Sequence, residues 1–214
     1  MRAVTSTTGP GDQELWRRAS DGDAAAFGEL FDRHATVVYN HLFRRTANWT
    51  EAEDLTSAVF LQAWRSRGKV AIDRESALPW LLGVANHVLR NSRRAARRYH
   101  AALARIAPDT LSAHDHADSV AAAVDDERRM AELQLAISAL PRPEREVVEL
   151  CTWSGLDYPA AAVALGVPLG TVKSRMHRAR RRLAASLGAS PGGRPEPVTQ
   201  ASRVSAASPI EETP

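Results

Sequence analysis

Residues 158–183 read YPAAAVALGVPLGTVKSRMHRARRRL, and this stretch holds two helical patterns on either side of a short break. The first pattern ends at Leu165, and the glycine that follows, Gly166, readily adopts the positive φ at which helices stop. Val167 and Pro168 then lead into the second pattern. Two helices joined by so tight a turn are typical of a helix-turn-helix, whose second helix lies in the major groove of DNA.

The second helix of this pair is apolar on one face, at Val172, Met176, Ala179, Leu183 and Leu187. A turn of about 100° per residue places hydroxyls and arginines on the opposite face. Arginine pairs with guanine and hydroxyls contact bases or phosphates, so we expect binding through Thr171, Lys173, Ser174, Arg175, Arg178, Arg181 and Arg182. A helix that merely ends in favourable cations would show the same arginines, but the preceding turn favours DNA binding.

Helical patterns fill most of the remaining chain. Apolar residues recur at steps of three and four from residue 13 to 64 and again from 79 to 98, with residues 68–79 largely as a loop between them. Asp23 is the expected N-cap of the second helix, and Thr50 opens a capping box with Glu53. Further helices fit the segment before Leu140 and residues 143–153. No alternating strand pattern occurs, so the sequence predicts an all-α fold.

Composition divides these helices into two domains. Residues 99–126 are rich in Ala, Asp and His with weak periodicity, and residues 188–214 are mostly Pro, Gly, Ser, Thr and Ala. We therefore expect a disordered N-terminus at 1–11, a first helical domain at 12–98, a flexible linker at 99–126, a second helical domain at 127–187 and a disordered tail at 188–214.

Positive charge is concentrated in two blocks, although the net charge of the 214 residues is only +3. The first block holds Arg90, Arg93, Arg94, Arg97, Arg98 and Arg105, and the second holds Lys173, Arg175, Arg178, Arg180, Arg181 and Arg182. Neither block contains an acid between its first and last cation. Solvated helix faces usually mix the two signs, so the blocks indicate two contacts with a polyanion.

Other classes of protein find little support in the sequence. No apolar run approaches the roughly 20 residues that span a bilayer, and the polar N-terminus lacks a secretion pattern, so we expect a cytoplasmic protein without membrane contact. His114, Asp115 and His116 come closest to a metal-ligand set, but no cysteine lies near them. Cys151 lies in an apolar run and is expected to be a buried hydrophobe. We expect no metal, no cofactor and no small-molecule substrate.

Both helical domains resemble parts of the bacterial sigma-70 family. Residues 140–183, LPRPEREVVELCTWSGLDYPAAAVALGVPLGTVKSRMHRARRRL, resemble its region 4. The first domain resembles region 2 in the stretches AFGELFDRHATVVYNHLFRR (26–45), AEDLTSAVFLQAWR (52–65) and PWLLGVANHVLRNSRRAARR (79–98). A chain with these two regions and no others resembles the extracytoplasmic-function (ECF) branch of the family.

The resemblance implies partners and positions for the first domain. Core RNA polymerase would bind it through the clamp coiled coil of the largest subunit, and the flap of the polymerase is a further partner of the chain. The residues implied at the clamp are Glu53, Asp54, Leu55, Thr56, Val59 and Phe60. Those implied at the −10 promoter element are Asn86, His87, Arg90, Asn91, Arg93, Arg94 and Arg97, and the 68–79 loop would cradle a flipped-out base. An anti-sigma factor is a further partner that the resemblance implies.

The leading hypothesis is a sigma factor that recruits core polymerase to promoter DNA. Binding of the −10 and −35 elements by two linked domains would supply specificity through modest contacts. The alternative is a stand-alone helix-turn-helix regulator, which predicts dimerisation and tight operator binding without polymerase. An enzyme such as a nuclease would need clustered carboxylates or a general acid and base, and the acids here stand in helix-start groups without a partnering histidine.

Overall fold

The structure, a computed structural model, describes residues 9–106 and 121–186. Its elements in chain order are α1 (Asp12–Ser20), α2 (Ala24–Thr46), α3 (Trp49–Ser66), the 3-10 turn η1 (Arg67–Lys69), α4 (Leu78–Ile106), α5 (Ala121–Ser138), α6 (Arg142–Val148), the π-turn η2 (Glu149–Trp153), α7 (Tyr158–Leu165) and α8 (Leu169–Ser186). The two described ranges contain helices and no strand, which confirms the predicted all-α class. None of the helices described is long and apolar enough to cross a membrane.

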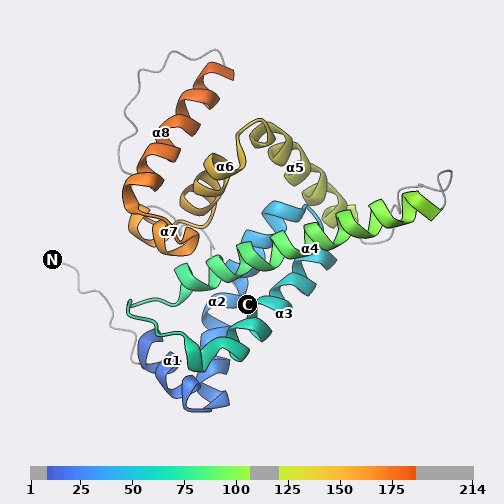
Figure 1. Ribbon diagram of the computed structural model, residues 1–214. Helices are drawn as coiled ribbons and strands as arrows, with labels where there is room; N and C mark the ends of the chain where they lie inside the picture. The colour runs from blue at the N-terminus through green and yellow to red at the C-terminus, as the bar shows by residue number, and fades with distance from the viewer. Residues whose placement is uncertain (1–8, 107–120, 187–214) are drawn as a thin grey trace, which may run out of the picture.

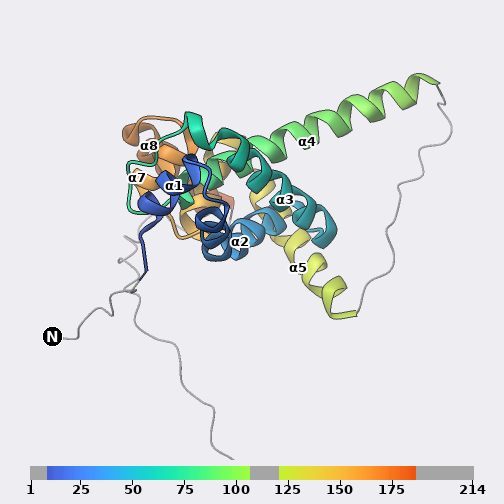
Figure 2. The same cartoon turned by 90° about the horizontal axis from the view of Figure 1, so that it is seen from below.

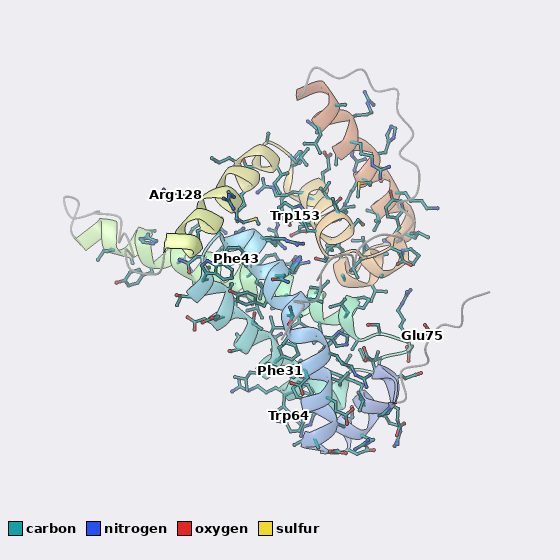
Figure 3. The ribbon with its side chains drawn as sticks, turned by 180° about the vertical axis from the view of Figure 1, so that it is seen from behind. Phe31, Phe43, Trp64, Glu75, Arg128 and Trp153 are labelled. Atoms are coloured by element: carbon teal, nitrogen blue, oxygen red, sulfur yellow. The ribbon has the colours of Figure 1, made fainter. Side chains whose placement is uncertain are left out.

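The first helical unit consists of α1 to α4, and α2 lies at its centre (Figure 1). Leu15, Leu30, Val59 and Leu81, one from each helix, are at most 1% exposed and form its core. Aromatic rings fill the end of the unit near α1, where Phe27 and Trp64 lie 5.1 Å apart and Phe31 contacts Phe60 at 4.7 Å. Figure 3 shows Phe31 and Trp64 together at this end. Because Leu15 of α1 lies in this core, α1 belongs to the first unit.

Two helix caps test the boundaries that the sequence predicts. Asp23 caps α2 as expected, because its carboxylate accepts hydrogen bonds from the N–H groups of Ala25 and Ala26. The predicted cap of α3 is wrong: Asn48, not Thr50, precedes the helix in extended conformation and accepts from the N–H of Glu51 at 2.7 Å. The Asn side chain offers an acceptor oxygen as Thr does, so the helix starts two residues earlier than predicted.

The helix α4 has 29 residues and passes the point where a linker was expected to begin. It continues through Tyr99 to Ile106, and α5 begins at Ala121, so both ends of the segment 99–126 are helical. Figure 2 shows the C-terminal half of α4 running out from the rest of the molecule. Residues 107–120, with the sequence His114-Asp115-His116, lie outside the described residues, as do 1–8 and 187–214.

The second helical unit consists of α6, η2, α7 and α8 packed around Val147, Leu150 and Val172, which are fully buried. Gly166 ends α7 with φ of 63°, as the sequence predicts. The preceding helix α5 lies against α2 of the first unit, where Gln134 donates to the carbonyl of Arg44. At the end of α5, the carbonyl of Ser138 accepts from Arg145 of α6, so α5 contacts both units.

The two units pack directly against each other through α4 and α7 (Figure 1). Backbone approaches backbone at Gly83, where a Cβ would lie 2.8 Å from the carbonyl oxygen of Ala164. A second contact between the units is an ion pair between Arg45 of α2 and Glu149 of η2, with Nε and Oε2 3.1 Å apart and both side chains buried. Arg44 donates to the carbonyl of Trp153, which is labelled in Figure 3. The arrangement is closed, and a charged pair lies within its interface.

Candidate nucleic-acid interface

The helix α8 has the two faces that its sequence predicts. Val172, Met176 and Ala179 are at most 4% exposed and pack into the second unit, and Leu183 is half-buried. Leu187 falls outside the described residues. This inward stripe fixes the helix against α6 and α7 and leaves the other face outward.

The outward face of α8 carries the predicted DNA-binding side chains. Lys173, Ser174, Arg178, Arg181 and Arg182 are exposed, and Thr171 and Arg175 are half-buried. The hydroxyl of Ser174 donates to the carbonyl of Thr171 at 3.0 Å, within the first turn. Farther along, Arg178, Arg181 and Arg182 line a hollow of about 340 Å³. Hydroxyls thus lie near the helix N-terminus and cations behind them, which suits base reading followed by phosphate contacts.

One carboxylate orients two of these arginines. Glu144 of α6 is 5% exposed, and its two oxygens lie 3.3 Å from Arg178 Nε and 3.1 Å from Arg182 Nε. Glu144 is a site residue that was not predicted from the sequence. The sequence places Glu144 three and four residues before Val147 and Val148, on the apolar face of α6. An acid on a buried face requires a cationic partner, so this spacing could have identified it.

The candidate −10 residues on α4 do not share one environment. Asn86 is 2% exposed, so the expectation that it faces DNA is wrong in this arrangement: its carboxamide lies in the interface between the units. Arg90 lies 3.8 Å from Glu146 of the second unit, and Arg93 donates to the carbonyl of Arg45. The exposed members of the set are His87, Asn91, Arg93, Arg94 and Arg97. Asn91 Nδ2 donates to His87 Nε2 at 2.8 Å.

A buried polar cluster surrounds Asn86. Its Oδ1 accepts from Arg45 and from His41 Nε2, the latter at 3.1 Å, and His41 Nδ1 lies 2.9 Å from the hydroxyl of Ser154. Because an amide oxygen only accepts, His41 carries its proton on Nε2 and accepts from Ser154. Burial, and after it the charge of Arg45, lowers the pKa of His41 to about 3. Burial likewise raises the pKa of Glu149 and lowers that of Arg45. The cluster therefore requires a neutral histidine.

The polymerase face that the sequence predicts on α3 is only partly at the surface. Glu53 and Asp54 are exposed. The side chains of Leu55, Thr56, Val59 and Phe60 are at most 8% exposed and belong to the core, so their expected contact with polymerase is corrected. The reason is helical geometry, because a run of neighbouring positions must cover both faces of a helix.

Two exposed apolar side chains complete that outer face and were missed from sequence. Leu61 is 49% exposed and lies two turns after Glu53 on the same side of α3, and Phe31 of α2 is 42% exposed. The spacing of four residues through Ser57 could have identified Leu61. Acidic and apolar side chains together make a surface suited to a basic partner with its own apolar groups.

The connection between η1 and α4 borders a cavity of about 650 Å³. Residues 67–73 form one wall of this cavity, and Trp16, Arg17 and Ser20 of α1 contribute to the opposite wall. Trp80, which follows the loop, is half-buried and packs edge-on against Trp16 with the ring centroids 4.8 Å apart. The cavity is large enough for a nucleobase, and its lining offers both charged and apolar groups.

The described residues offer neither a metal site nor a reactive thiol. Within ranges 9–106 and 121–186, no group of three His, Cys, Asp or Glu side chains could hold a metal ion. Cys151 is half-buried, and burial raises the pKa of its thiol to about 11. Such a thiol stays protonated and unreactive near neutral pH.

Both units match described protein families. Residues 30–99 match sigma-70 region 2, and residues 130–183 match sigma-70 region 4. The ECF RNA polymerase sigma factor SigK of Mycobacterium tuberculosis (strain H37Rv) is 31% identical over 176 residues, covering 79% of this chain and 89% of that protein. SigE of Mycolicibacterium smegmatis is 33% identical over 165 residues, covering 76% of this chain and 63% of that protein.

Solved structures share the fold. CnrH, in complex with the cytosolic domain of CnrY, superposes with a TM-score of 0.62 at 25% identity, covering 83% of this chain and 97% of CnrH. The sigma factor RpoE of Bartonella quintana, solved with the anti-sigma factor NepR, gives 0.55 at 21% identity, covering 76% and 96%. With both regions matched and relatives above 30% identity spanning most of the chain, the protein belongs to the ECF branch of the sigma-70 family, the factors that direct RNA polymerase to promoters.

Proposed function

We propose a division of promoter recognition between the two units. The outward face of α8, from Thr171 to Arg182, binds the −35 element. The observation that carries this assignment is the helix-turn-helix of α7 and α8, in which a fully buried Val172 fixes a face of hydroxyls and arginines outward. Arg178 and Arg182, aligned by Glu144, and Arg181 between them contact phosphates or bases there.

The first unit contacts polymerase and the −10 element on separate surfaces. Glu53, Asp54, Leu61 and Phe31 form the polymerase face, which meets the clamp coiled coil of the largest subunit; the flap is a partner of the second unit. The −10 surface consists of the exposed α4 residues His87, Asn91, Arg93, Arg94 and Arg97 together with Arg90. The cavity beside residues 67–73 receives a flipped-out base of the melted strand.

Promoter binding requires the closed arrangement to open. Arg90 is paired with Glu146, and the polar cluster around Asn86 is buried by the second unit. Both units cannot reach separate promoter elements while α7 packs on α4. Binding to polymerase supplies the contacts that compensate for the lost interface, and residues 99–126 act as the linker between domains 12–98 and 127–187.

Regulation by an anti-sigma factor fits the same arrangement. Two proteins of similar fold were solved in complexes of this kind, CnrH with the cytosolic domain of CnrY and RpoE with NepR. We propose that this chain is also held by such a partner. The chain itself performs no catalysis, and the phosphodiester chemistry belongs to the polymerase.

Run-off transcription with purified core polymerase tests the proposal. Addition of the chain should produce promoter-dependent transcripts that core polymerase alone does not make. A gel shift at about 0.15 M salt should show weak binding by the free chain, because contacts mainly to phosphates weaken steeply with salt. Tight operator binding without polymerase, with no initiation, would instead identify the stand-alone regulator.

A further inference from the structure

Three side chains of α1 lie one helical turn apart and face the loop formed by residues 70–77. They are Asp12, Trp16 and Ser20, a spacing that places them on one side of the helix. Each makes a hydrogen bond to the loop or to the turn that precedes it. The stripe therefore contacts the loop at both of its ends.

The start of the loop is held by the C-terminal half of α1. The indole N–H of Trp16 donates to the carbonyl of Val70 at 2.7 Å, and the hydroxyl of Ser20 donates to the carbonyl of Arg67 at 2.8 Å. In return, Arg67 Nε donates to the carbonyl of Ala19 at 3.1 Å. Trp16 is 3% exposed, so its bond is protected from water.

The end of the loop is held by a single buried carboxylate. Asp12 Oδ2 accepts from the N–H of Ala77 at 2.9 Å and from the hydroxyl of Ser76 at 3.3 Å. Ser76 in turn accepts from the N–H of Leu78, the first residue of α4. The carboxylate thus contacts the loop at its junction with α4, directly at Ala77 and through the hydroxyl of Ser76.

Two side chains of α2 hold Asp12 in place and favour its charged form. Arg33 Nη1 donates to Oδ1 at 3.1 Å, and His34 Nε2 lies 2.5 Å from Oδ2. Burial alone would raise the pKa of Asp12, but the hydrogen bonds from His34 and Ala77 outweigh it and lower the pKa to about 2. A 6% exposed carboxylate with four donors is a rigid anchor.

The anchors force the loop to bow outward. From Asp12 to Ser20 the helix is about 12 Å long, whereas an extended chain from residue 67 to 77 could span about 33 Å. Asp73, Arg74 and Glu75 occupy the exposed bow, and Figure 3 labels Glu75 there. Within the described part of the chain, residues 70–76 make no backbone–backbone hydrogen bond of their own, so their course depends on the bonds from α1 at either end and on Ile72, which is buried in the core.

We propose that α1 is a splint that sets the shape of loop 70–77 for base capture, and that Asp12 is its principal positioning residue. The inference rests on the proposed function of the neighbouring cavity, whose walls come from α1 and from the start of this loop. Asp12 and Trp16 both precede residues 30–99, the part that matches region 2, so the splint adds a determinant of −10 selection outside it.

The test compares Asp12→Ala and Asp12→Asn with Asp23→Ala in holoenzyme assembled on core polymerase. Asp23 is a matched control: it is also a carboxylate that accepts from helix N–H groups and pairs with an arginine, Arg18, but none of its bonds reaches the loop. Open-complex formation is measured on promoters that carry each of the four bases at the captured position, on duplex and premelted templates. Polymerase affinity and thermal stability are measured in parallel.

Loss of the anchor should change base selection rather than assembly. Asp12→Ala should reduce discrimination at the captured base by about tenfold at unchanged polymerase affinity, because bonds to a charged acceptor are lost. Asp12→Asn, which keeps one acceptor for Ala77, should lie between. Asp23→Ala should lower stability and leave discrimination as in the wild type. Equal behaviour of the Asp12 and Asp23 variants, or full discrimination by Asp12→Ala, overturns the proposal.

A second measurement tests whether α1 shapes the loop, independently of whether the loop captures a base. Amide hydrogen exchange at Ala77, whose N–H is bonded to Asp12, should accelerate in Asp12→Ala and, because the start of the loop is released, in Trp16→Phe, which removes the indole donor together with part of a buried ring. Should the wild-type chain show no base discrimination, the proposed capture site fails, and the exchange data still decide whether α1 shapes the loop. Unchanged exchange in both variants rejects the splint; should Asp12→Ala not fold, Asp12→Asn and Trp16→Phe provide the same comparison.

Discussion

Glu144 contacts two arginines of α8. Replacing it changes how these side chains are oriented and leaves their positive charges in place. Glu144→Gln removes the ion pairs with Arg178 and Arg182, so both side chains regain rotamer freedom that DNA binding must again restrict. We expect discrimination between −35 sequences to fall by about tenfold, while binding to unrelated DNA strengthens and depends more steeply on salt.

Fluorescence anisotropy of holoenzyme on −35 variants, at several salt concentrations, checks this expectation. Glu14→Gln is the control, since it removes one negative charge and one arginine pairing on α1, far from α8 along the chain. An unchanged ratio between specific and unrelated DNA would show that Glu144 does not align the arginines.

Arg175 is predicted to contact a base, and Arg181 is predicted to contact phosphates. Arg175 is half-buried beside the apolar stripe near the N-terminal end of α8, where base edges are read, and Arg181 is exposed near the other end. Arg175→Ala should cost roughly 1–3 kcal/mol at one base position. Arg181→Ala should weaken binding about equally on all sequences. Affinities for a set of single-base −35 variants distinguish the two patterns, and a uniform loss for Arg175→Ala would assign it to a phosphate.

At the scale of helices, the approach of α4 to α7 depends on one missing side chain. A Cβ at Gly83 would meet the carbonyl of Ala164 at 2.8 Å, so Gly83→Ala cannot be accommodated in the closed arrangement. Alanine also favours the helix itself, by about 1 kcal/mol. We expect Gly83→Ala to open the units while the first unit keeps or gains stability.

Small-angle scattering and thermal unfolding measure the two parts of that prediction. Gly28→Ala provides the control, because Gly28 is also helical and no atom lies within 4 Å of a Cβ there. An increased radius of gyration for Gly83→Ala and none for Gly28→Ala is expected. Equal radii for the two variants would mean that α4 and α7 adjust without separating.

Sequence patterns identified the elements with local signals and missed those set by tertiary contacts. Asp23, Gly166 and the Val172 stripe all act within one helix or turn, and each was predicted correctly. Asn86 and Phe60 were assigned to binding faces by position, from the resemblance to sigma-70 region 2. Their burial follows from which side of α3 or α4 the other helices cover, and spacing within one helix does not contain that information.

At the scale of the molecule, the interface between the units should respond to pH. His41 is neutral in the closed arrangement with its pKa lowered to about 3, and opening returns it to water, where its pKa is about 6.5. The open form therefore binds the extra proton, and closure weakens as pH falls from about 6.5, by about 2 kcal/mol at pH 5. The raised pKa of Glu149 acts in the opposite sense, at pH values between the ordinary carboxyl pKa and the raised one, where the closed form binds the proton and the open form does not.

Energy transfer between dyes on α3 and α8 can follow this opening from pH 7.5 to 5. His41→Gln retains hydrogen-bonding groups but does not titrate, so its distances should be independent of pH. Glu149→Gln should open the units even at pH 7.5, since it leaves the buried Arg45 charge without its ion pair. Constant energy transfer in the wild type over this range would contradict the assigned role of His41.

The uninterrupted course of α4 has a mechanical consequence. One rod of about 43 Å runs from the loop anchored by Asp12, past the contact at Gly83, to the arginines at its far end. A pivot of only 10° at the N-terminal end would sweep the opposite tip through about 7 Å, roughly two base-pair steps of duplex. Side chains that never approach nucleic acid can in this way set the register at which the distant guanidinium groups engage the backbone.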